Sequence, residues 1–279
     1  MRGREFMLPF ALFMLPLIGV APTTPVAPPT PELVAKWNLS KHYQKCLMLG
    51  ELPILGSSKV RDEALREAQW ILIHMMEGRE DLVRAIAQKK IRVVVMAVDE
   101  RTLDTPEHAD LMPAEYWNRR ARGLGATIWR PATSCGEENL LEIPGDPYKG
   151  ENILIHEFGH TVHEIGLARV DPTFDGRLQK AFETAMAGGK WKGTYAATNH
   201  KEYWAEGVQA WFDCNDNRNL VVTRAELVKA DEGLSSLLRE IFGDKPWRYL
   251  PPSKRSPPER IHLGSFHPAN APEFSWGKP

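Results

Sequence analysis

The stretch Ile153-Leu154-Ile155-His156-Glu157-Phe158-Gly159-His160 decides the fold, because it sets a His-Glu-x-x-His pattern inside an apolar helical run. On an α-helix, residues four apart lie one above the other, so His156 and His160 present two imidazole nitrogens to one point. Glu157 projects beside that point and can hold a water molecule. Two neutral nitrogens, a carboxylate and an open coordination position suit a catalytic zinc ion. The alternative is two ordinary histidines with an accidental glutamate beside them.

The composition is that of a globular protein: 43% of the 279 residues are hydrophobic and 25% are charged. The formal net charge of −1 gives no electrostatic basis for nucleic acid or an anionic membrane as the main partner. Cys46, Cys135 and Cys214 form no CxxC pair, so they are poor candidates for a thiolate zinc site. They allow at most one intramolecular disulfide, and a packed core must therefore supply most of the stability.

The N-terminal segment predicts the location of the protein. Arg2 and Arg4 precede an apolar run from Phe6 to Val20, which is typical of a signal peptide and shorter than a usual membrane span. Residues 1–21 are therefore predicted to be a signal peptide or, because Pro22 would hinder cleavage, an uncleaved signal anchor. Residues 22–31 are rich in proline and predict an extended linker. We expect a secreted or cell-envelope protein with no membrane contact beyond that anchor.

The hydrophobic periodicities predict a single α+β domain over residues 32–250, followed by a Pro-rich tail at 251–279. Residues 99–122 are predicted to be an irregular connection in which His108 is solvated. The motif helix is predicted to begin at Gly150 or Glu151 and to end at Gly166, a residue type that often caps helices. Glu137 and Glu138 are predicted to line a cleft or, as the favoured alternative, to form a charged strand face. Further helices are predicted at 57–76, 81–88, 174–186, 200–212 and 234–242, and strands at 91–98, 126–129 and 134–143.

A third zinc ligand has to come from outside the motif helix. The extended pattern HExxHxxGxxH requires glycine at 163 and histidine at 166, but this chain has His163 and Gly166. Glu202 and Glu206 are four residues apart on one face of a predicted, aromatic-rich helix. Two stacked carboxylates on a buried helix repel each other unless a cation or a histidine partners them. The alternative is a solvated acidic stripe.

These residues together carry a resemblance to a known family. HEFGH at 156–160, followed by Tyr195, Glu202 and Glu206 in the arrangement Y-x6-E-Y-W-A-E, resembles the anthrax lethal factor family of gluzincin metallopeptidases. That family also includes the proline–proline endopeptidases, and the two matching blocks lie between Gly150 and Phe212. The resemblance implies a zincin-like domain with a small sheet, an HExxH active-site helix and a helical C-terminal subdomain.

The resemblance also implies a role for each matching residue. His156, His160 and Glu202 would bind one zinc ion, and Glu157 would be the general base. Tyr195 would stabilise the tetrahedral intermediate, and Glu206 would orient a ligand histidine.

The expected function is therefore that of a zinc metalloendopeptidase acting on a peptide or protein. One alternative is a secreted binding or structural protein in which zinc only stabilises the fold, although a structural zinc site requires neither Glu157 nor Tyr195. Another is a zinc-free scaffold in which the motifs are coincidental.

Overall fold

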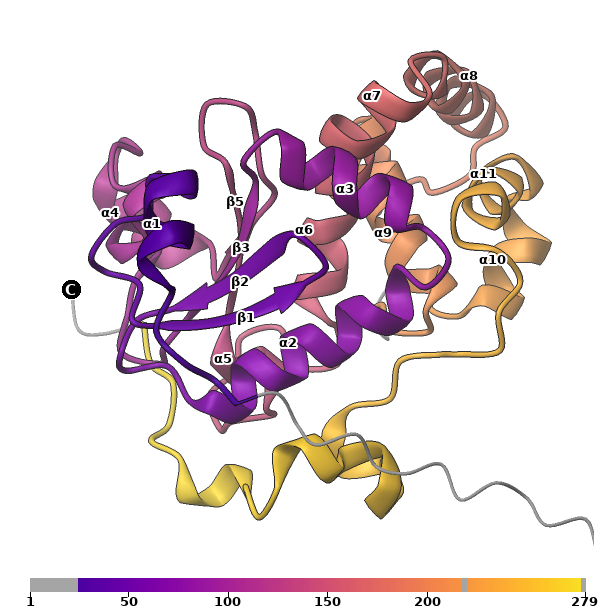
Figure 1. Cartoon of the computed structure of the whole chain (residues 1–279). Helices are drawn as coiled ribbons and strands as arrows, with labels where there is room; N and C mark the ends of the chain where they lie inside the picture. The colour runs from indigo at the N-terminus through magenta and orange to yellow at the C-terminus, as the bar shows by residue number, and fades with distance from the viewer. Residues whose placement is uncertain (1–24, 217–219, 277–279) are drawn as a thin grey trace, which may run out of the picture.

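The computed structural model describes residues 25–216 and 220–276, which are arranged around one five-stranded sheet (Figure 1). The strand order is β1 (Lys45–Leu49), β2 (Leu52–Gly56), β3 (Arg92–Met96), β5 (Ala132–Gly136) and β4 (Gly123–Leu124). Strands β2, β3 and β5 are parallel, whereas β1 and β4 run antiparallel to their neighbours. The predicted signal segment lies outside the described residues. Within them, no helix has the length and apolar character that a membrane span requires.

Helices flank this sheet and form a separate group beyond it (Figure 1). Helix α2 packs against β1 and β2, and α6 packs against β5 and β4. Helix α9 lies along α6, and α8, α10 and α11 pack around α9. This arrangement confirms the predicted mixed class with a small sheet. The helices are α1 (Pro31–Trp37), α2 (Asp62–Met75), α3 (Glu80–Gln88), α4 (Ala114–Arg120), α5 (Glu137–Leu140), α6 (Ile153–Thr161), α7 (Ala168–Val170), α8 (Phe174–Ala187), α9 (His200–Trp211), α10 (Arg224–Ala230) and α11 (Glu232–Phe242).

The strongest strand signal of the sequence is confirmed at β3. Its three consecutive valines, Val93 to Val95, are buried, as expected for a β-branched run covered on both faces. The hairpin of β1 and β2 was not predicted. Its two-residue turn contains Gly50 with a φ of 55°, a conformation that glycine adopts without steric cost.

One strand prediction is wrong and another is only partly confirmed in the region that leads to the motif helix. The predicted strand at 126–129 is absent: Ala126 is buried, Thr127 and Arg130 form hydrogen bonds with each other, and Ile128 and Trp129 between them are 65% and 90% exposed. The predicted strand at 134–143 is confirmed only over residues 134–136, because β5 ends at Gly136 and α5 begins at Glu137. In both places, hydrogen bonds made by turn residues and by side chains determine the conformation, and the local pattern of residue types does not reveal them.

The predicted irregular segment 99–122 also contains regular structure, since α4 occupies Ala114–Arg120. His108 in this segment is 1% exposed and not solvated as predicted. The neighbouring Glu107 forms a buried ion pair with Arg92 of β3, with 2.6 Å between its Oε1 and Nη1 of the arginine. This contact holds the segment against the sheet, and burial lowers the pKa of His108.

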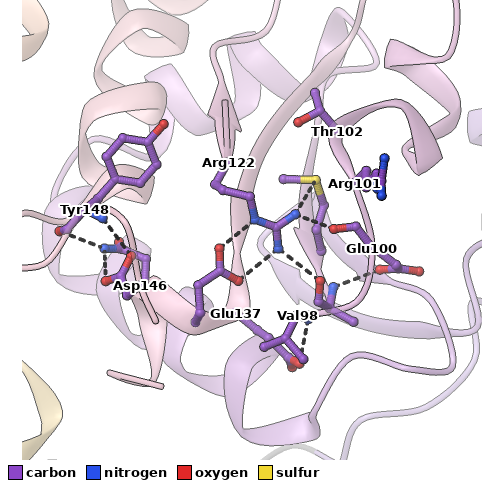
Figure 2. A network of polar contacts seen from close by, with 12 residues as sticks. Val98, Glu100, Arg101, Thr102, Arg122, Glu137, Asp146 and Tyr148 are labelled. Carbon is purple, nitrogen blue, oxygen red and sulfur yellow. Dashed lines mark hydrogen bonds and ion pairs between the residues drawn. The ribbon is translucent and has the colours of Figure 1, made fainter. Parts of the chain in front are cut away.

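Buried ion pairs hold α5 and β4 in place (Figure 2). Nε and Nη2 of Arg122 donate to Glu138 at 2.6 and 2.9 Å, and Nη2 also donates to the Ala97 carbonyl at 3.0 Å. Glu137 accepts hydrogen bonds from the backbone and side chain of Arg61 at 2.8 and 2.9 Å. Both glutamates are fully buried, so neither predicted alternative for them, a cleft lining or a charged strand face, is correct. Arg122 immediately precedes β4, and this network fixes where that edge strand begins.

The motif helix differs from its prediction at both ends. It begins at Ile153, where Oδ1 of Asn152 accepts the backbone N–H of Ile155 at 2.9 Å. It does not end at Gly166, because the chain continues through a π-helical segment, η3 (Val162–Leu167), into α7. A Cβ at Gly166 would lie 3.3 Å from side-chain atoms of Leu82 and Ile86, so glycine here allows α3 to pack closely.

The C-terminal tail packs on the domain through specific contacts. Arg255 donates to Glu67 of α2 at 2.6 and 2.8 Å, and both side chains are buried. The backbone N–H of Phe274 donates to the Pro144 carbonyl at 2.8 Å. At the other end of the chain, Ala27 of the predicted linker forms an antiparallel bridge with Cys46. All three cysteines are buried and unpaired.

Candidate metal centre

Two helices bring three potential metal ligands together. Nε2 of His156 and Nε2 of His160, both on α6, lie 3.2 Å apart. Oε2 of Glu202, on α9, lies 3.3 Å from the first nitrogen and 3.2 Å from the second. Ligands held tetrahedrally at about 2.0–2.1 Å from zinc are separated by about 3.3 Å, so this triangle has the size that one zinc ion requires.

The electrostatics of the triangle also fit a cation. Oε2 of Glu202 is buried and has no hydrogen-bond partner among the described residues, which is costly for a carboxylate unless a cation partners it. Burial acts to lower the pKa of His156, but Glu202, Glu157 and Glu206 outweigh it and raise this pKa to about 10. Burial acts to raise the pKa of Glu202, but His156 and His160 hold it below its ordinary value. The residues present therefore fit a bound zinc ion.

The close approach of α6 and α9 depends on Gly159. A Cβ at this position would lie 3.3 Å from the side chain of Val208, so a larger residue would push the two helices apart. The carbonyl of Gly159 also accepts a hydrogen bond from Nε1 of Trp204 at 2.9 Å. The middle residues of the motif thus set the spacing between the helices that carry the ligands.

Gln209 fixes the tautomer of His156. Its Nε2 lies 3.3 Å from the Asn152 carbonyl and 3.3 Å from a carboxylate oxygen of Glu151, two acceptors that require a donor. Its Oε1 therefore faces His156 and accepts Nδ1–H at 2.8 Å. Once Nε2 loses its proton, the remaining proton stays on Nδ1 and the Nε2 lone pair of His156 points toward the triangle. Sequence reasoning did not single out Gln209, although it follows Glu202 and Glu206 at helical i, i+4, i+7 spacing.

Glu206 lies near the site but farther from the ring that it was expected to orient. Its Oε1 is 4.0 Å from Nδ1 of His156, and its Oε2 accepts a hydrogen bond from Nδ2 of Asn215 at 3.1 Å. Burial raises the pKa of Glu206. In this geometry Gln209 makes the orienting hydrogen bond, and Glu206 acts on His156 through its charge.

Glu157 and Tyr195 line one cavity of about 330 Å³ together with His156 and Arg120. Burial raises the pKa of Glu157, and the nearby histidines partly offset this effect. Tyr195 comes from the short helix η4 (Tyr195–Ala197) and is partly exposed. Burial and the Glu202 carboxylate raise the pKa of its phenol, whereas Arg120 lowers it.

Strand β4 lies directly on the motif helix because glycines flank Leu124. A Cβ at Gly123 would lie 3.0 Å from Cγ of Glu157 and 2.3 Å from Ile153. A Cβ at Gly125 would lie 2.8 Å from Cβ of His160. These contacts place the edge of the sheet next to the cavity that contains the general-base candidate.

His163 lies outside the triangle and is not among the residues that line this cavity. Its Nε2 contacts Oδ1 of Asp175 at 2.9 Å, and burial lowers its pKa to about 4.

Comparison of the chain with protein-family models, with curated proteins and with solved structures finds no match. The function is therefore inferred from the site itself.

Proposed function

We propose that this protein is a zinc-dependent metallopeptidase with one catalytic ion bound by His156, His160 and Glu202. The observation that carries this proposal is the triangle of donor atoms 3.2–3.3 Å apart, with a buried carboxylate oxygen that has no other partner among the described residues. Glu157 and Tyr195 line the cavity that His156 also reaches. A purely structural zinc site is closed by four protein ligands, whereas this one has three and an adjoining cavity.

The chemistry divides between the ion and the protein. When bound, zinc supplies a Lewis acid that activates water and polarises a carbonyl oxygen. Glu157 accepts the proton of the attacking water and delivers it to the leaving amine, a task that its raised pKa favours. The Tyr195 hydroxyl donates a hydrogen bond to the carbonyl oxygen as negative charge develops there.

An extended peptide is the substrate that the fold accommodates best. Strand β4 is the last strand of the sheet, so its outer edge has no partner strand among the described residues. It lies against α6 beside Glu157. A peptide that pairs with such an edge would pass the general-base candidate in extended form, which is the form that β-strand addition recognises.

Glu157→Gln tests the mechanism. This variant should lose peptide hydrolysis by a factor of about 100 or more, as expected for a general base, while it retains zinc. Glu164→Gln is the matched control, since it removes a carboxylate near the same helix that pairs with Lys201 at the surface. Hydrolysis of a peptide library and the zinc content of each variant provide the measurement. Retained activity in Glu157→Gln would disprove the assignment.

The alternative is a secreted protein in which zinc only stabilises the fold. It predicts bound zinc that is lost in His156→Ala, together with no hydrolysis of any library peptide by the wild type. We also propose export through residues 1–21, which the N-terminal sequence of the mature protein tests directly.

A further inference from the structure

We propose that His163, Asp175 and His200 form a second binding site for a divalent transition metal ion, separate from the triangle at His156, His160 and Glu202. Their ligand atoms all lie within 4.8 Å of one another. This inference does not depend on peptide hydrolysis, because it concerns binding alone.

Three separate elements supply the donors. His163 lies in η3, Asp175 in the first turn of α8 and His200 at the start of α9. Oδ1 of Asp175 lies 2.9 Å from Nε2 of His163 and 3.1 Å from Nε2 of His200. Both distances are close to the separation between ligands of one tetrahedral ion. Two imidazoles and one carboxylate suit zinc and the neighbouring late transition metals.

The surroundings combine a fixed ligand with open coordination positions. His163 is 3% exposed, and its ring packs against the contacting rings of Phe174 and Trp204, with ring centroids 5.9 and 6.3 Å away. The Asp175 side chain is 64% exposed, so water can complete the coordination sphere. The buried His163 therefore provides a fixed ligand, and the exposed Asp175 provides a ligand that water can accompany.

The competing explanation is a metal-free cluster in which both histidines donate to Asp175. In that cluster one carboxylate oxygen accepts two N–H groups, and the site has no affinity for a cation beyond that of an ordinary surface carboxylate. In the metal site, both Nε2 atoms are deprotonated and face the ion. Metal content distinguishes the two arrangements.

The second site would share both helical segments of the first. His163 follows His160 by one helical turn, and His200 precedes Glu202 on α9. An ion here would tie the first turn of α8 to the same pair of segments that hold the first triangle. Its loss should therefore weaken the attachment of α8 without removing any ligand of the first site.

The experiment measures zinc bound per chain, by elemental analysis of the full-length protein after equilibration with excess zinc and gel filtration. The wild type and Glu164→Gln should bind two equivalents. Asp175→Asn and His200→Ala should each bind one, and His156→Ala should also bind one. Titration with Co²⁺, followed by its visible absorption, should show two sites in the wild type and one in Asp175→Asn.

One equivalent in the wild type, unchanged by Asp175→Asn and lost in His156→Ala, would overturn the second site and leave the proposed peptidase intact. Two equivalents retained by both Asp175→Asn and His200→Ala would also overturn it. Circular dichroism confirms that each variant is folded. If Asp175→Asn does not fold, His200→Ala decides the outcome alone. The His200 side chain is partly exposed at the first residue of α9, so its removal should leave the fold intact. Activity retained in Glu157→Gln would reject the peptidase mechanism without bearing on the second site.

Discussion

Gln209→Leu is the most informative perturbation of the candidate metal centre. Leucine approximates the size of glutamine but can neither accept Nδ1–H of His156 nor donate to the Asn152 carbonyl. Gln209 is fully buried, so water does not readily replace the lost partners. The variant leaves every proposed zinc ligand and Glu157 in the chain.

The structure gives the size of the expected effect. The 2.8 Å bond from His156 fixes the tautomer that presents Nε2 to the ion. Loss of such an outer hydrogen bond lowers metal affinity by roughly 10- to 100-fold, or about 1.4–2.8 kcal/mol. The folded protein should also lose about 1–3 kcal/mol for each buried polar group that is left without a partner.

Competition for zinc with a chromophoric chelator measures the affinity, and urea unfolding measures the stability. Gln179→Leu is the control, because within the described residues Gln179 makes a single side-chain hydrogen bond, to Glu183 of α8. If Gln209→Leu binds zinc as tightly as the wild type and the control, then Gln209 does not set the state of His156. In that case Glu206, 4.0 Å from the same nitrogen, becomes the candidate for this role.

Three further perturbations test the fold around the site. Gly125→Ala should lower the free energy of unfolding by about 1–3 kcal/mol, because the added methyl group would lie 2.8 Å from Cβ of His160 on the motif helix. Gly176→Ala is the control in the same urea unfolding experiment, because a methyl group there meets open space and should not lower the stability. Arg255→Ala should lower the free energy of unfolding by about 3–5 kcal/mol, because Glu67 would lose its buried guanidinium partner. A loss below about 1 kcal/mol in urea unfolding would contradict this reasoning. Burial lowers the pKa of His108, so below about pH 6.5 the unfolded chain binds a proton that the folded chain does not, and stability falls as the pH falls. His108→Leu should therefore show a shallower decrease in unfolding free energy between about pH 7 and pH 5, and an unchanged slope would refute this reasoning.

The sequence by itself determined the features that depend on neighbours along the chain. His156 and His160 face one point because i and i+4 coincide on any helix. The valine run of β3 and the apolar stripes of α2, α8 and α11 are likewise local patterns, and all four elements are present. The capping box of Thr223 and Glu226 at the start of α10 belongs to the same class. The identification of Glu202 came from a family resemblance, and the structure brings its carboxylate to the histidine pair.

Only the tertiary structure decided the features that depend on groups far apart in the sequence. Glu137 and Glu138 are buried because Arg61 and Arg122 reach them from other elements, and no local pattern encodes those partners. Gly166 does not end the motif helix but lies in η3, where the close packing of α3 leaves no room for a side chain. Gln209 became visible as the partner of His156 only once α6 and α9 were placed side by side. Helix periodicity specifies which residues share a face, whereas long-range packing and buried charge pairing determine what that face meets.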